Sequence, residues 1–172
     1  NNDFFDLNII TDSKEEDVYV TEDYTNKLYR LDADTGAVVW GPVPYTFPGC
    51  TFDAGVPVSK INMSSNTLII TMAMDSCVTG IDKNTGAHKW TFNSPNNATF
   101  FIEPFVLNDV LYHMNGKVLA IDTNTGKLLA VSPPLPVENY NDKLISYDPI
   151  RNVIWRSTNQ QDFYAYKPVQ LP

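Results

Sequence analysis

The chain has 172 residues, a formal net charge of −8, 43% hydrophobic residues and 19% charged residues. This length favours one domain with a sizeable core, and the composition argues against disorder. The acidic balance, with no basic cluster, argues against nucleic acid as a partner, and the apolar runs are far shorter than the roughly 20 residues of a membrane-spanning helix.

Short runs with alternating apolar residues follow one another along the chain, and they predict β-strands. Ahead of each of four hairpin segments lie two such runs, at 4–11 and 18–22, 58–63 and 67–72, 100–107 and 110–114, and 143–147 and 153–157. Turn-forming Asn, Ser, Gly and Pro residues separate the runs, and no stretch has helical periodicity. The sequence therefore predicts an all-β chain.

A hairpin containing Asp-x-x-Thr-Gly recurs three times, and a fourth copy at 163–167 keeps the strand without the turn. In such a turn the Asp carboxylate accepts backbone N–H groups and the Gly adopts a positive φ. Two copies end in Trp40 and Trp90, and the third has Ala130 at that place. The predicted turn residues are Asp32, Thr35, Gly36, Asp82, Thr85, Gly86, Asp122, Thr125 and Gly126.

Four-stranded units repeated at this spacing predict a β-propeller of about four four-stranded blades. We place the blades at 1–43, 56–93, 99–132 and 140–172, with an inserted loop at 44–57. The repeat resembles that of the pyrroloquinoline-quinone-type propellers, which include quinoprotein dehydrogenases and non-enzymatic scaffolds such as outer-membrane assembly lipoproteins. The resemblance implies that Trp40 and Trp90 dock each blade against its neighbour.

Catalytic chemistry finds no support in the sequence, so we expect no enzyme, no cofactor and no metal site. His88 and His113 each lie in a strand-like run without a second ligand at metal-binding spacing, and we interpret them as strand histidines on a solvated face. The repeat itself explains the three turn aspartates. A fragment of a quinone-dependent dehydrogenase remains an alternative, although those enzymes have larger rings and many use adjacent cysteines at the cofactor.

The two cysteines and two glycosylation sequons favour a secreted, extracellular protein. Cys50 lies in the inserted loop and Cys77 begins a strand, and we predict a disulfide between them, with two separate thiols as the alternative. The sequons begin at Asn62 and Asn97, and we expect one or both to carry sugar in a eukaryotic host, with ordinary polar turns at both as the alternative.

The fourth blade is expected to leave a sheet edge open, because its last strand would be 169–171, between two prolines. Either residues 1–6 or a neighbouring chain would complete it. We therefore predict a non-catalytic structural subunit that associates with itself, as an oligomer or fibre. A module that binds another protein or a glycan is the alternative. The candidate association edges contain Phe4, Leu7, Val169 and Leu171.

Overall fold

The structure is a computed structural model that describes residues 7–12, 14, 16–22, 25–50, 58–72, 77–93, 104–114, 117–133, 144–157 and 163–169. Within these ranges the chain forms fifteen β-strands and no helix. The all-β prediction is confirmed. Phe4, Asn97 and Leu171 lie outside the described residues.

The strands form four antiparallel sheets, which we call blades 1 to 4, and in each sheet the neighbours are consecutive in the chain. Blade 1 contains β1 (Leu7–Thr11), β2 (Asp17–Glu22), β3 (Lys27–Asp32) and β4 (Val38–Pro44). Blade 2 contains β5 (Val58–Met63), β6 (Thr67–Met72), β7 (Cys77–Asp82) and β8 (His88–Asn93). Blade 3 contains β9 (Phe105–Leu107), β10 (Val110–Met114), β11 (Val118–Asp122) and β12 (Leu128–Val131). Blade 4 contains β13 (Leu144–Asp148), β14 (Val153–Ser157) and β15 (Phe163–Tyr166).

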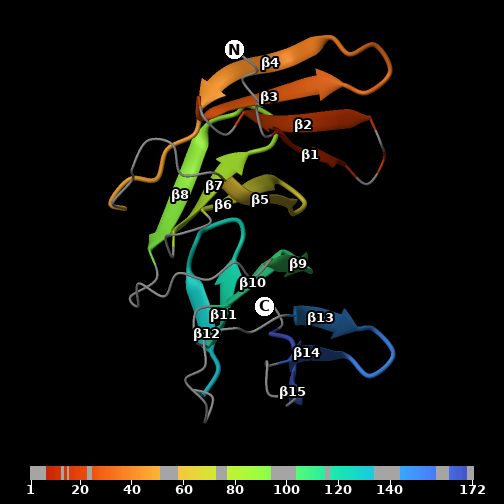
Figure 1. The fold of residues 1–172 in the computed structure, drawn as a ribbon, viewed down its shortest axis with the longest axis vertical. Helices are drawn as coiled ribbons and strands as arrows, with labels where there is room; N and C mark the ends of the chain where they lie inside the picture. The colour runs from red at the N-terminus through yellow and green to blue at the C-terminus, as the bar shows by residue number, and fades with distance from the viewer. Residues whose placement is uncertain are drawn as a thin grey trace, which may run out of the picture.

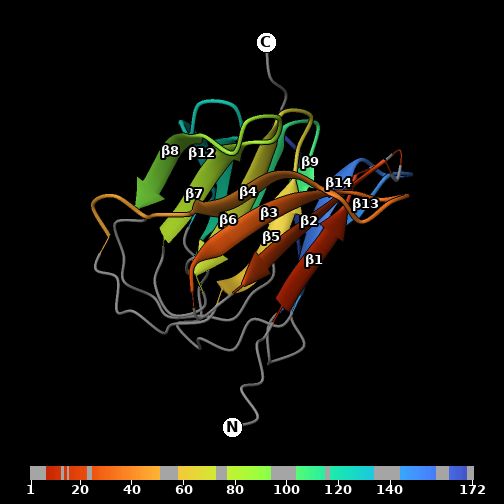
Figure 2. The same ribbon diagram turned by 90° about the horizontal axis from the view of Figure 1, so that it is seen from above.

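The four blades are stacked face to face in a row, as expected for a β-propeller (Figure 1). The first strands of neighbouring blades lie together, because β1 contacts β5 and β5 contacts β9. Figure 2 looks along the row and shows blade 1 in front of the others. The propeller prediction is confirmed, and in the described part of the chain blades 1 and 4 lie at opposite ends of an open arc (Figure 1).

Burial along the strands follows from this arrangement. In the middle of the row, Leu68, Ile69 and Ile70 of β6 are all 0% exposed, since blade 2 has a neighbouring sheet on both faces. In blade 1, only alternate residues of β2 are buried. The same alternation occurs on β14 of blade 4. The end blades therefore have one covered face each.

Blade 4 differs from the prediction at its last strand. Val169 lies outside any strand, and its N–H donates to the Tyr112 hydroxyl of blade 3 at 2.7 Å. The same hydroxyl donates to the Val169 carbonyl at 3.3 Å. Because both backbone groups are already bonded, Val169 does not offer the free strand edge that the sequence suggested.

Candidate functional site

The three Asp-x-x-Thr-Gly turns are built by local hydrogen bonds. Asp32 Oδ1 accepts the Thr35 N–H at 2.8 Å, and the Gly36 N–H donates to the Asp32 carbonyl at 2.9 Å. The turns of blades 2 and 3 close in the same way, with Gly86 and Gly126 donating to the aspartate carbonyls at 2.9 and 2.8 Å. The three glycines have φ values of 70°, 74° and 71°. Each aspartate therefore holds its own turn.

The hydrogen bonds also lower the pKa of two of these carboxyl groups, those of Asp32 and Asp82. Thr35 lowers the pKa of Asp32 through its hydroxyl and its backbone N–H. For Asp82, burial raises the pKa, but hydrogen bonds from Thr85 and Asn84 and the charge of Lys89 leave it below its ordinary value. Asp32 and Asp82 are therefore hydrogen-bond acceptors with a lowered pKa, which does not suit either carboxyl to the role of a general acid.

Trp90 joins blade 2 to blade 3. Its indole N–H donates to the Thr123 carbonyl of the next turn at 2.9 Å, and the side chain is 8% exposed. A Cβ atom added at Gly126 would lie 2.7 Å from Trp90 Cδ2, and one added at Gly80 on β7 would lie 2.2 Å from Trp90 Cε2. The ring is thus enclosed between two glycines, one from each blade.

Trp40 occupies the corresponding place between blades 1 and 2. A Cβ atom added at Gly86 would lie 3.1 Å from Trp40 Cε3, and the Trp40 ring centroid is 6.1 Å from that of Tyr19. Within the described residues its buried Nε1 has no hydrogen-bond partner. Trp40 therefore contributes packing without the polar contact that Trp90 makes.

The disulfide prediction is confirmed, since Cys50 and Cys77 are joined with an S–S distance of 2.02 Å. The bond ties the loop after β4 to the start of β7. The Asn93 side-chain amide adds a contact by donating to the Gly49 carbonyl at 3.1 Å. The loop is therefore anchored to blade 2 at two neighbouring strands.

The two histidines differ, although the sequence treats them alike. His88 is exposed and its Nε2 lies 2.9 Å from the Thr91 hydroxyl. His113 is 7% exposed, and burial lowers its pKa to about 4. The expectation of a solvated face was wrong for His113, because blade 3 is covered on both faces.

Other candidate sites have little support in the residues that the structure describes. These residues contain no group of three or more His, Cys, Asp or Glu side chains that could hold a metal ion. They also contain no membrane-spanning helix. Asn62 lies on β5 with a buried Nδ2, and glycosylation at this residue stays a prediction.

The outer face of blade 1 is apolar and exposed. Leu7 and Ile9 of β1 are 54% and 61% exposed, and the strand register places Val20 opposite Ile9 and Tyr29 opposite Val20. We call this surface the blade 1 end face; besides these four residues it includes Val38, which is 57% exposed.

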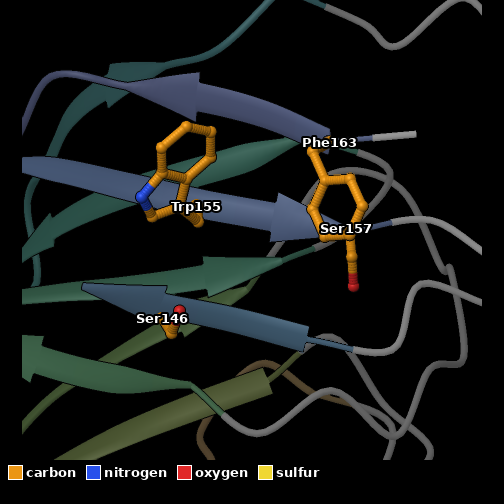
Figure 3. A pocket seen from close by; sticks show the side chains of 4 residues that line it. All are labelled: Ser146, Trp155, Ser157 and Phe163. Carbon is orange, nitrogen blue, oxygen red and sulfur yellow. The ribbon is translucent and has the colours of Figure 1, made fainter. Parts of the chain in front are cut away.

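The outer face of blade 4 is apolar as well. Trp155 of β14 and Phe163 of β15 line a hollow of 360 Å³ together with Ser146 and Ser157, and Phe163 is 70% exposed. Figure 3 shows these four side chains on one face of the sheet. We call this surface the blade 4 end face. It is the face that would receive a following blade in a propeller.

The comparisons with known proteins agree with this architecture. The family described as outer membrane protein assembly factor BamB matches residues 7–167. No sequence among the curated proteins matches the chain. Among solved structures, BamB from Moraxella catarrhalis is 18% identical with a TM-score of 0.66, over 92% of this chain and 45% of that one.

Two further structures show how widely the fold is shared. Sqt1 from Saccharomyces cerevisiae is 14% identical with a TM-score of 0.65, over 95% of this chain and 46% of that one. The quinohemoprotein alcohol dehydrogenase ADHIIG from Pseudomonas putida HK5 is 20% identical with a TM-score of 0.57, over 83% of this chain and 27% of that one. The chain therefore spans less than half the length of these three proteins, and at such identities the likeness shows the fold alone.

Proposed function

The chain belongs to the family of the outer membrane protein assembly factor BamB, and from this premise we propose that it is a non-catalytic propeller module that works by binding protein, first of all a second copy of itself. One observation carries the proposal: both end faces of the row are apolar and exposed, whereas the inner blades are covered on both faces. Exposed apolar patches of this kind mark interaction surfaces.

The arrangement favours a head-to-tail contact. The blade 4 end face of one copy is the surface on which a following blade would pack, and the blade 1 end face of another copy is such a blade. A heterologous contact of this kind generates a closed ring where its rotation closes, and we expect two copies to join in this way at both ends.

The size of the contact lies near the lower limit for a stable pair. With strands about 4.8 Å apart and a rise of about 3.3 Å per residue, the four strands of blade 1 present about 300 Å² and the three described strands of blade 4 about 240 Å². Two contacts, each with one face of either kind, cover about 1,100 Å², close to the lower limit of about 1,200 Å² for specific interfaces. The net charge of −8 opposes association. Salt screens that repulsion, so the pair strengthens as salt rises.

Sedimentation velocity of the full chain at micromolar concentration tests the proposal. We expect a dimer that becomes a monomer when Ile9→Asp changes the blade 1 end face or Trp155→Asp changes the blade 4 end face. Ile150→Asp is the matched control, because Ile150 is 90% exposed in the β13–β14 turn, away from both end faces. A wild-type monomer at low and high salt would overturn self-association and leave another protein as the partner.

Mixing the two end-face variants tests the head-to-tail geometry. An Ile9→Asp copy keeps its blade 4 end face, and a Trp155→Asp copy keeps its blade 1 end face. The mixture therefore regains one of the two contacts and forms a weaker heterodimer. The alternative geometry pairs two blade 1 end faces with each other, or two blade 4 end faces. Each variant would then keep one unchanged end face for such a pair and would remain a dimer when studied alone.

The disulfide supports the further proposal that the protein works in an oxidising, extracellular or periplasmic compartment. Intact mass of native material before and after reduction checks this. Free thiols at both cysteines in unreduced native protein would contradict it.

A further inference from the structure

The junction between blades 3 and 4 lacks the tryptophan that the other two junctions share. Trp40 and Trp90 each extend from the outer strand of one blade to the turn glycine of the next. On β12 this place holds Ala130, and blade 4 has no Asp-x-x-Thr-Gly turn to receive a ring. The partner of Ala130 on β11 is Ala120, so both sides of the strand pair are small.

Among the described residues, no larger neighbour refills the space. A pocket of 190 Å³ lies there, with Ala120, Ala130 and Ser132 of blade 3 on one side and Ile154, Tyr166 and Val169 on the other. We call this pocket the ring slot. An apolar cavity of about 150 Å³ is enough to bind benzene, whereas drug-sized ligands need about 300 Å³ or more. The ring slot therefore has the volume for one aromatic ring system.

We propose that the ring slot binds a tryptophan side chain supplied by a segment of another protein. At the two equivalent junctions the repeat itself places an indole, carried on an outer strand. Among the described residues β12 pairs only with β11, so its outer edge can take an added strand that carries such a side chain. This inference does not depend on association through the end faces.

The slot also has a partner for the indole N–H. The Ser132 hydroxyl accepts the Val118 N–H at 2.9 Å and donates to the Pro133 carbonyl at 3.0 Å. A hydroxyl oxygen has two lone pairs, so one remains to accept a further N–H. Ser132 thus offers an acceptor for an indole N–H, as the Thr123 carbonyl does for Trp90, but from the blade that carries Ala130 and not from the following blade.

The test is a titration followed by the amide NMR signals of the protein, with N-acetyl-tryptophanamide as the probe and N-acetyl-leucinamide as the control ligand. We expect saturable binding of the tryptophan probe at millimolar concentration, with shifts at residues of the ring slot. The measurement is repeated on the Ile9→Asp variant, in which the blade 1 end face is changed. Binding to the ring slot is thereby tested separately from self-association through the end faces.

Ala130→Trp fills the slot from β12 and should weaken binding by about tenfold or more while raising Tm. Ala87→Trp is the matched control, because Ala87 is exposed in the blade 2 turn and its substitution should leave binding unchanged. If Ala130→Trp fails to fold, Ala120→Leu fills the slot from β11 and should weaken binding as well. Three results would each overturn the proposal. They are the absence of saturable binding, binding that neither filling variant weakens, and a protein that binds free indole but does not bind the tryptophan probe.

Discussion

Adding one methyl group at the same turn position of three blades separates backbone strain from inter-blade packing. Gly36, Gly86 and Gly126 have φ values of 70°, 74° and 71°, so alanine meets the same backbone penalty at each. Their surroundings differ. An added Cβ meets nothing within 4 Å at Gly36, Trp40 at 3.1 Å from Gly86, and Trp90 at 2.7 Å from Gly126.

The expected loss of unfolding free energy rises in that order. A left-handed conformation costs an alanine about 1–2 kcal/mol, and the reduced entropy of the unfolded chain returns about 0.4–1 kcal/mol, so Gly36→Ala should cost about 1 kcal/mol. Overpacking against the Trp90 ring adds about 1–3 kcal/mol, which brings Gly126→Ala to about 2–4 kcal/mol. Gly86→Ala should fall between them.

Reversible chemical denaturation measures these differences, with Gly36→Ala as the backbone control. The double variant Trp90→Ala/Gly126→Ala gives the decisive comparison, because removing the ring removes the overlap. We expect a coupling free energy of about 1–3 kcal/mol between the two positions. Equal costs at all three glycines, or additive effects of Trp90 and Gly126, would refute the view that the indole determines the need for glycine.

Further predictions follow from single contacts. Trp90→Ala should cost about 3–5 kcal/mol of unfolding free energy, measured in urea, and Trp40→Ala should cost less because its N–H has no described partner. Removing the disulfide with Cys50→Ala/Cys77→Ala should cost about 3 kcal/mol, seen as a lower Tm, and an unchanged Tm would contradict it. The pKa of His113 is about 4 in the fold and 6.5 when unfolded, so the unfolded chain takes up a proton first, and stability should fall from pH 6.5 to pH 4 by about 3 kcal/mol from this group. His113→Leu should reduce that fall in urea titrations at several pH values, and an unchanged pH slope would count against the burial of His113.

The local elements of this protein could be predicted from its sequence. The Asp-x-x-Thr-Gly turns depend on hydrogen bonds between residues at most five apart, so the shared motif forms the same turn in blades 1, 2 and 3. Strand alternation predicts the hairpins for the same reason, and their repetition predicts stacked sheets. The disulfide could be placed because only two cysteines are present.

Features that depend on the neighbouring sheet could not be predicted in this way. His88 and His113 both lie in strands, and only the stacking decides that His113 is covered while His88 is exposed. Val169 reads as a strand residue, but the Tyr112 hydroxyl of another blade takes its backbone groups. The replacement of tryptophan by Ala130 is visible in the sequence, yet only the packing of blade 4 decides whether the space closes or remains as a pocket. Burial and cavities are properties of surfaces that meet from distant parts of the chain, and no local pattern specifies how closely they meet.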